Sequence, residues 1–449
     1  MNWRKPFIYA LLYLSGSKVP EHLKQISEYE YAGREELEKM QRDKLRTLLI
    51  HAYQNVPYYR KILHECGVVS KGKGDVVLEN FSRIPLLTKE IIRTQSNNLY
   101  SCDYKDRKSY ENTSGGSTGE AVRFLQDKEY DDWNIATKLY FNMALGKEPG
   151  QPEIKLWGSR RDILAGNLAL RNRLINLLYN RKFFNSYRLG KREIDELIDL
   201  NNRFKPVAYW AYMESALELA RYLVRHDLFF HPPKIVVSTI GPLTDEVRDT
   251  IESHMHCKLY NQYGSREVGA ISSQCAKQGP MHTFPWWNYI EILDEEGAAV
   301  QNREGRVVVT TLHNYSMPLI RYEIGDVAVA GGWGCDCGRN SMLLEKVVGR
   351  TLGYFKRSDG SMAHSHFLVQ TLFFKDWIKR FQIIQDEIDH VIMKVQLNKN
   401  AKAAESDVED IIRKTKIMMG KSCNVDFEYV EDIRSTASGK HEYTICKVE

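Results

Sequence analysis

The stretch Lys234-Ile-Val-Val-Ser-Thr239 decides the fold class, together with Leu243–His256 and Lys258-Leu-Tyr-Asn-Gln262, which follow it. The first and last of these segments are short, apolar and rich in β-branched or aromatic residues, which predicts buried strands. Between them, apolar residues recur at helical spacing behind Thr244, a candidate N-cap. Strand, helix and strand at this spacing predict a βαβ unit and therefore a parallel α/β sheet.

Two loops of this unit are expected at the edge of the sheet where ligands bind. In open parallel sheets that edge lies beyond the carboxyl ends of the strands. The segments Ile240-Gly-Pro242 and Tyr263-Gly-Ser-Arg-Glu267 both follow a predicted strand. We therefore treat Glu267 as a candidate site residue and not as an ordinary surface carboxylate.

Periodic patterns extend to both sides of this unit. Thr88 is a candidate N-cap for a short helix. Longer helices are predicted at 33–56, 130–145, 167–180, 191–202 and 214–226, and strands at 121–125, 154–157, 289–293 and 306–312. Beyond residue 353, a hairpin at 381–397, a helix at 406–419 closed by Gly420 and a strand at 425–430 predict a small α+β unit.

The run Asn112-Thr-Ser-Gly-Gly-Ser-Thr-Gly-Glu120 is a candidate anion-binding loop. Glycines let the backbone approach a ligand closely, and successive N–H groups and hydroxyls can surround a phosphate. The run is not a Walker A motif, because Glu120 and not lysine follows the last glycine. Taken alone, it fits a polar surface turn equally well.

Composition excludes several classes of function. The chain has 449 residues, 43% of them hydrophobic and 27% charged, which is typical of a globular protein with more than one domain. A net charge of +5 with scattered basic residues does not indicate nucleic-acid binding. Eight cysteines without a short secreted framework favour a reducing compartment, so we expect a cytoplasmic protein.

The N-terminal segment leaves two readings open. Phe7–Leu14 is the longest early apolar run, well short of the roughly 20 residues that cross a bilayer. It either packs against the domain or lies on a membrane surface, anchored by Trp3 and the basic pair Arg4 and Lys5.

Four residues form a candidate structural zinc site: Cys275, His282, Cys335 and Cys337. Two close cysteines with a further Cys/His pair suit tetrahedral zinc, although the spacing is not that of a common zinc finger. In a reducing compartment the Cys-x-Cys pair favours a metal over a disulfide. The alternative is a set of unrelated thiols and imidazoles.

An ordered set of motifs resembles the adenylate-forming (acyl-activating) superfamily. The set comprises the glycine-serine run, 263–267, Arg321-Tyr-Glu-Ile-Gly-Asp326, Gly349-Arg350 and Ser438-Gly-Lys440. Two longer segments, 314–326 and Cys335-Asp-Cys-Gly-Arg339, look like the phenylacetate–CoA ligase branch, and in particular its members associated with capsule and surface-polysaccharide biosynthesis.

The resemblance implies a fold and a reaction. The fold would be a large multi-sheet N-terminal α/β adenylation domain (1–348), a hinge (349–353) and a small mobile α+β C-terminal lid (354–449). A carboxylate would attack ATP to form an acyl-adenylate, and a thiol of CoA or an amine would then displace AMP. The runner-up is a non-catalytic nucleotide-binding protein with the same fold.

The resemblance also implies roles for single residues. Lys440 would stabilise charge as the adenylate forms, and Glu267 would hold Mg²⁺. Tyr263 would stack on adenine, Asp326 would bind the ribose and Arg350 would approach ribose or phosphate. The remaining ATP contacts would come from Thr113, Ser114, Gly115, Gly116, Ser117, Thr118, Gly119, Gly264 and Ser265.

The identity of the acid stays open at the level of the sequence. Pocket residues are expected from 157–160, 209–212 and the loops near Ile240 and Gly264. Arg160 and Arg161 would suit an anionic substrate, whereas the aromatic residues would suit an aromatic acid. Gly353 stands where the superfamily commonly has a hinge aspartate, which puts the second step more in doubt than ATP binding.

Overall fold

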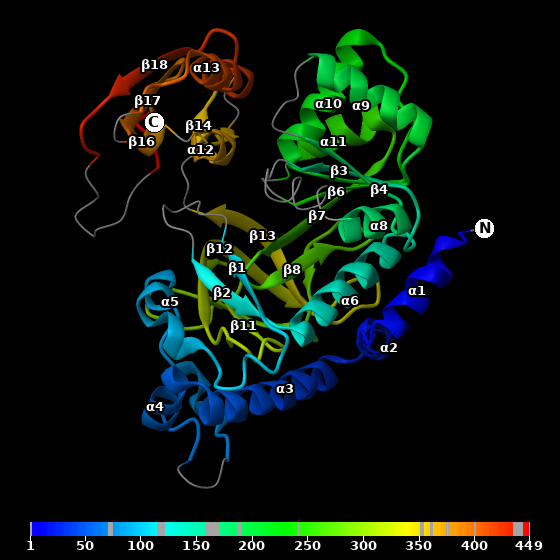
Figure 1. Ribbon diagram of the computed structural model, residues 1–449, viewed down its shortest axis with the longest axis vertical. Coiled ribbons are helices and arrows are strands. Elements are labelled where there is room, and N and C mark those ends of the chain that lie inside the picture. The colour runs from blue at the N-terminus through cyan, green and yellow to red at the C-terminus, as the bar shows by residue number, and fades with distance from the viewer. Residues whose placement is uncertain are drawn as a thin grey trace. The chain divides into compact units, whose positions relative to one another are not determined.

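The computed structural model describes residues 2–70, 75–114, 122–157, 170–185, 191–239, 243, 245–350, 354–359, 362–373, 375, 377–398, 401–433 and 443–448. Contacts between residues divide the chain into two compact units (Figure 1). Unit 1 comprises residues 1–113 and 123–348, and unit 2 comprises residues 114–122 and 349–449. The division into an adenylation domain, a hinge and a lid stays a prediction, because residues 351–353 lie outside the described part of the chain.

Unit 1 is built on a mixed sheet, for which the described residues give eleven strands in the order β10-β11-β12-β13-β9-β8-β7-β6-β5-β3-β4. Its parallel part consists of β3 (Glu153–Trp157), β4 (Arg181–Asn185), β5 (Ala208–Ala211), β6 (Ile235–Ser238) and β7 (Lys258–Ser265). The other strands are β8 (Gly269–Gln274), β9 (Met281–Thr283), β10 (Asn288–Leu293), β11 (Glu304–Thr311), β12 (Tyr322–Trp333) and β13 (Met342–Arg350). A two-stranded ribbon of β1 (Tyr110–Thr113) and β2 (Arg123–Gln126) accompanies the sheet.

Helices bury both faces of the parallel strands, as the α/β prediction requires. On one side α2 (Val19–Tyr29), α3 (Arg34–Asn55) and α6 (Lys128–Ala144) contribute to a core around Trp210 and Trp287. On the other side α9 (Lys191–Phe204), α10 (Met213–His226) and α11 (Asp245–Met255) pack on Ile154, Tyr209 and Val236. Among the described residues of unit 1, the remaining α-helices are α1 (Arg4–Leu14), α4 (Pro57–Glu65), α5 (Lys89–Gln95) and α8 (Leu170–Leu178), and the 3₁₀ helices are Leu78–Arg83 and Ser96–Leu99.

The predicted βαβ unit is confirmed: β6 and β7 are parallel neighbours joined by α11. The predicted cap is also confirmed, since the backbone N–H of Ile91 donates to Oγ1 of Thr88 at 3.3 Å. The predicted C-terminal boundary of the second strand of this unit was wrong. The strand expected to end at Gln262 continues to Ser265, because β7 turns back through a hairpin and pairs antiparallel with β8.

Strands β4 and β5 were not predicted from the sequence. The prediction that Tyr209, on β5, lines the substrate pocket was also wrong. Strand β5 is only four residues long, too short to show a period. Tyr209 is fully buried under α9, where its hydroxyl donates to Oδ1 of Asn201 at 2.9 Å. It therefore belongs to the core and lines no pocket.

Unit 2 is a small α+β unit with a core of its own around Phe355, Ile383, Met393 and Ile411. The predicted hairpin is confirmed as β16 (Ile378–Glu387) and β17 (His390–Leu397). These strands lie in a sheet of order β18-β17-β16-β19, with β18 at Asn424–Tyr429 and β19 at Thr444–Cys446. The other elements are β14 (Tyr354–Lys356), β15 (Met362–His364), α12 (His366–Phe373) and α13 (Glu405–Met419), which ends at Gly420.

Candidate functional site

The hairpin between β7 and β8 carries Glu267 at its turn. Gly264 is required where the two strands approach, because a Cβ there would meet the carbonyl oxygen of Gly269 at 2.4 Å. Hydrogen bonds from Gln126 and Tyr130 to the backbone hold the turn in place. Nε2 of Gln126 donates to the carbonyl oxygen of Arg266 at 2.8 Å, and the hydroxyl of Tyr130 donates to that of Glu267 at 3.4 Å.

The carboxylate of Glu267 is buried without a cation of its own. The residue is 2% exposed, and the hydroxyl of Tyr322 donates to its Oε1 at 3.4 Å. No lysine, arginine or histidine of the described residues lies within ion-pair distance of it. Burying a carboxylate without a positive partner is costly, so this position suits a bound cation.

Asp326 lies on a bulge of β12, in contact with Tyr263 of the β7–β8 hairpin. Between Glu323 and Val327 this strand has extra residues relative to β11, and Gly325 adopts a φ of 89° that glycine permits. The bulge turns the Asp326 side chain inward, where it is 8% exposed. The hydroxyl of Tyr263, on β7, donates to Oδ2 of Asp326 at 2.7 Å. The structure thus brings two of the residues expected around ATP into direct contact.

Part of the predicted phosphate loop is described. Thr113 ends β1. The backbone N–H of Ser114 donates to the carbonyl oxygen of Val122, and the backbone N–H of Val122 donates to Oγ of Ser114, both at 2.9 Å. Gly115, Gly116, Ser117, Thr118 and Gly119 lie outside the described residues, as do Lys440 and the side chain of Arg350.

Gln126 is a site residue that the sequence analysis missed. Its Oε1 accepts hydrogen bonds from the Tyr110 hydroxyl at 3.1 Å and from Nδ2 of Asn112 at 3.0 Å, while its Nε2 donates to the Glu267 turn. Gln126 therefore ties the β1–β2 ribbon to the turn that carries Glu267. A single glutamine at the end of a strand has no pattern that could have indicated this role.

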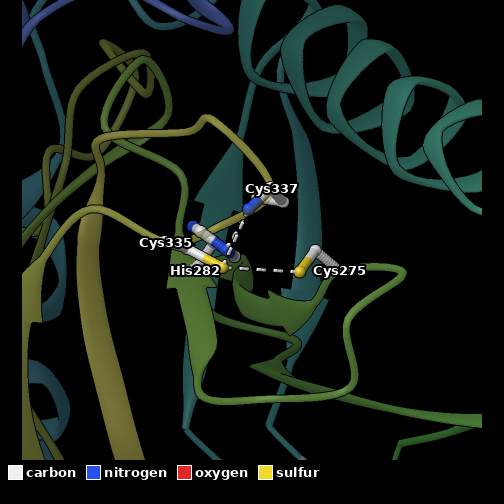
Figure 2. Close-up of side chains that lie close together, drawn as sticks. All are labelled: Cys275, His282, Cys335 and Cys337. Carbon is white, nitrogen blue, oxygen red and sulfur yellow. Dashed lines mark hydrogen bonds between the residues drawn. The ribbon is translucent and has the colours of Figure 1, made fainter.

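The four predicted zinc ligands come together from three segments of unit 1, and their side chains point toward one another (Figure 2). Cys275 follows β8, His282 lies on β9, and Cys335 and Cys337 lie in the loop between β12 and β13. Their ligand atoms all lie within 4.8 Å of one another.

The separations within this Cys/His cluster suit a tetrahedral ion. Sγ of Cys275 and Sγ of Cys335 are 3.9 Å apart, and Sγ of Cys337 is 3.5 Å from Nε2 of His282. With zinc bonds of about 2.3 Å to sulfur and about 2.0 Å to nitrogen, tetrahedral ligands would lie about 3.8 Å apart for two sulfurs and about 3.5 Å apart for sulfur and nitrogen. The other ring nitrogen, Nδ1 of His282, is 3.1 Å from the hydroxyl of Ser341, the kind of outer contact that orients a metal-binding imidazole.

The electrostatics of the cluster favour a cation as well. Burial lowers the pKa of His282 to about 4, so the imidazole is neutral and can offer a lone pair. Burial raises the pKa of the Cys275 thiol to about 11. Against the effect of burial, hydrogen bonds from Arg339 hold the pKa of Cys337 below its usual value. A divalent ion would favour deprotonation of all three thiols.

Known proteins of similar sequence belong to the branch that the motifs resemble. Residues 355–447 match the model of the CapK C-terminal domain. The chain is 23% identical over 421 residues to CapK of Staphylococcus aureus, covering 92% of this chain and 90% of that protein. It is 25% identical over 335 residues to a phenylacetate-coenzyme A ligase of Thermus thermophilus, covering 72% of each. Its homologues are CapK and the phenylacetate–CoA ligases. The resemblance read from the motifs is confirmed.

The fold prediction is confirmed by a solved structure. A 2-hydroxyisobutyryl-CoA ligase, solved with 2-HIB-AMP and CoA in the thioesterification state, superimposes with a TM-score of 0.65 at 18% identity. The match covers 94% of this chain and 92% of that one. The chain therefore has the fold of the adenylate-forming CoA ligases.

Proposed function

We propose that this protein is an ATP-dependent, AMP-forming acid ligase that transfers the acyl group to the thiol of CoA. The observation that carries the proposal is the contact between Tyr263 and Asp326 beside the buried carboxylate of Glu267. The names of the homologous phenylacetate–CoA ligases support the same reaction class.

The proposed roles follow from the chemistry of the side chains. The ring of Tyr263 would stack on adenine, and its hydroxyl would orient Asp326 so that the carboxylate accepts from the ribose. Gly264 and Ser265 would line the same edge. Ser114, Thr113 and the glycines at 115, 116 and 119 would surround the departing pyrophosphate, together with Ser117 and Thr118.

Glu267 would hold Mg²⁺, since its buried carboxylate has no cationic partner within the described part of the chain. The ion would neutralise charge on the phosphates of ATP. Arg350 and Lys440 would supply further positive charge at the α-phosphate, a role that their motifs support and their positions leave to experiment.

The Cys/His cluster would hold a structural zinc ion. With Cys275, His282, Cys335 and Cys337 as its ligands, the ion would have no open position for catalysis. Zinc would tie the β8–β9 segment to the loop after β12, the twelve-residue strand Tyr322–Trp333 that carries Asp326. Its contribution would be to stability and to the placement of that strand.

We propose CoA as the acyl acceptor. Transfer to an amine in its place is the other outcome that the test below can show. The name of the S. aureus relative, and the motifs shared with capsule-associated members, support a role in surface-polysaccharide biosynthesis. Which acid is activated is a separate question.

The decisive experiment follows pyrophosphate release from ATP with a panel of carboxylic acids, then AMP release on addition of CoA or of amines. We expect adenylate formation first and a CoA thioester second. Lys440→Ala should slow adenylate formation by about 10²–10³-fold, the usual effect of removing one charge-stabilising group. Lys447→Ala, a change at an exposed lysine seven residues further along the chain, is the matched control.

The alternative, a non-catalytic nucleotide-binding protein, makes a different prediction. ATP would bind, but no acid would release pyrophosphate, and Lys440→Ala would change nothing. The presence of Glu267, Asp326 and Lys440 together argues against this alternative, because a scaffold that only binds nucleotide has no need for the lysine.

We also propose that α1 rests on a membrane surface. Ile8 of α1 is buried, whereas Trp3, Phe7, Leu11 and Leu14 are 57%, 58%, 51% and 79% exposed at helical spacing. The first twenty residues contain Arg4, Lys5 and Lys18 and no acidic residue, which suits anionic headgroups even though Lys5 and Lys18 pair with Glu148 and Glu129. None of the helices within the described ranges is long and apolar enough to cross a bilayer.

A further inference from the structure

A group of positive side chains lies on one face of the parallel sheet near its β4 edge. Lys147, which precedes β3, and Arg181, which begins β4, both form ion pairs with the carboxylate of Glu153. Lys147 and Glu153 are 2% and 1% exposed, so these charges neutralise one another inside the core.

Lys155 continues the same face without such a partner. Its neighbours Ile154 and Leu156 point to the opposite side, into the core under α9 and α10. Nζ of Lys155 lies 5.4 Å from the ring centroid of Trp210 and 6.0 Å from that of Phe183. Among the residues that the structure describes, no carboxylate lies within ion-pair distance of this ammonium group.

Lys138 adds a further positive charge from α6, the helix that covers this face. It lies within electrostatic range of Lys155 and Arg181 and likewise makes no ion pair in the described ranges. The nearby carboxylate of Asp131 accepts a hydrogen bond from the Tyr110 hydroxyl at 2.9 Å.

The group therefore carries more positive than negative charge. Four cations, Lys138, Lys147, Lys155 and Arg181, meet two carboxylates, Glu153 and Asp131. Burial and then the charge of Arg181 lower the pKa of Lys155 to about 7. An anion bound beside Lys155 would remove this repulsion and restore the charged form of the lysine.

The position of Lys155 connects it to the ligand-binding edge. Two residues further along β3, the ring of Trp157 contacts that of Tyr212 in a tilted arrangement, with ring centroids 5.0 Å apart. Strand register aligns Lys155 with Trp210, Val237 and Tyr260 across β5, β6 and β7. Three strand spacings, about 14 Å, thus separate Lys155 from the strand that carries Tyr263. These register partners are buried in the core, and only an extended molecule that runs past the carboxyl ends of the strands could reach from one end to the other.

We propose that Lys155, assisted by Lys138, binds an anionic group at the far end of the acyl substrate. The enzyme would then select acids with a second carboxylate, phosphonate or phosphate remote from the carboxyl group that reacts. This inference rests on the proposed ligase function and names its substrate class. The plain alternative is that Lys155 only packs its aliphatic stem on Trp210 and Phe183 and extends its charge into water.

The test compares linear dicarboxylic acids of increasing length with their half-esters and with phosphonate analogues, using pyrophosphate release. We expect wild-type enzyme to prefer the acids that carry the second anion. Lys155→Met keeps the stem and removes the charge, and should lower kcat/KM for these acids about 10- to 100-fold, mainly through KM. The half-esters should change little, and Lys155→Arg should recover part of the loss.

Lys182→Met is the matched control. Lys182 lies on the adjacent strand β4 but on the opposite face, where its Nζ is 5.8 Å from the ring centroid of Phe204. It should leave the preference unchanged. Equal use of dicarboxylates and half-esters by wild type, or an equal effect of Lys155→Met on both, would overturn the inference.

Calorimetric titration of the same acids in the absence of ATP separates this inference from the proposed function. Absence of pyrophosphate release with every acid would refute the ligase, whereas the titration still compares binding to wild type and to Lys155→Met. Weaker binding of dicarboxylates alone to the variant supports the anion site, and identical binding refutes it.

Discussion

The hydroxyl of Tyr263 donates to Oδ2 of Asp326 across 2.7 Å, although β7 and β12 stand four places apart in the order of the sheet. In a flat sheet four strand spacings would separate them by about 19 Å. The contact therefore requires the antiparallel part of the sheet to curl back over the end of β7. This curl places two proposed ATP-binding side chains side by side.

Removing the Tyr263 hydroxyl should weaken ATP binding modestly. Tyr263→Phe keeps the ring for adenine but removes the donor at Oδ2 of Asp326, so we expect the KM for ATP to rise about 3- to 10-fold. Asp326→Ala should have a larger effect, because it removes the ribose acceptor as well. Tyr260→Phe, on the same strand, is the control. Unchanged ATP kinetics in both site variants would exclude this placement of the nucleotide.

The purified protein should contain zinc in an equimolar amount by elemental analysis. Cys335→Ser should abolish metal binding and lower the melting temperature, because binding to the folded state alone stabilises it. Ser341→Ala should weaken zinc binding about 10- to 100-fold by freeing the imidazole of His282. Cys102→Ser, at an exposed thiol, should do neither. Protein that is metal-free when purified without chelator and does not take up zinc would contradict the site.

Vesicle binding should depend on the exposed face of α1. Replacing Phe7 and Leu11 together by Ser should reduce co-sedimentation with vesicles that contain anionic lipid, while ATP-dependent activity in solution stays unchanged. Phe229→Ser alters another exposed aromatic residue, 72% exposed before β6, and is the control. Loss of self-association in the double variant, without any vesicle binding by wild type, would mean that the face contacts a second copy of the chain.

Acid should destabilise the protein through His22. Burial lowers the pKa of His22 to about 4, and its ring stacks on Trp133 at 4.1 Å. Because the unfolded histidine has a pKa near 6.5, the unfolded state binds the proton more tightly. The contribution of neutral His22 to the free energy of unfolding is complete above about pH 6.5. It decreases by about 1.4 kcal/mol per pH unit as the pH falls from there toward 4.

The variant that checks this prediction is His22→Phe, which keeps the stacking and cannot titrate. Urea denaturation between pH 7 and pH 5 should show a shallower loss of stability in this variant than in wild type. His282, whose pKa burial also lowers, contributes equally to both proteins and cancels in the comparison. Parallel curves for the two proteins would show that His22 does not couple folding to protonation.

The sequence was sufficient for features that depend on neighbouring residues. The β-branched run at 234–239 and the helical period after it specify a strand–helix–strand unit, and Thr88 can cap only the helix that follows it. The spacing of Cys335 and Cys337 also singled out a ligand pair. The prediction failed where the sequence pattern was too short or was not local. Strand β5 has only four residues, and the end of β7 is set by its pairing with β8, which no local pattern reveals.

Only the tertiary structure decided which residues from distant segments of the chain are in contact. Four residues named from the sequence as zinc ligands converge because β8, β9 and the loop after β12 adjoin in space. The link from Gln126 to the Glu267 turn, the Tyr263–Asp326 contact and the surplus charge around Lys155 join segments distant in the chain. Local propensity depends on a residue's own neighbours in sequence, whereas burial and electrostatic balance depend on the neighbours that sheet order and curl supply.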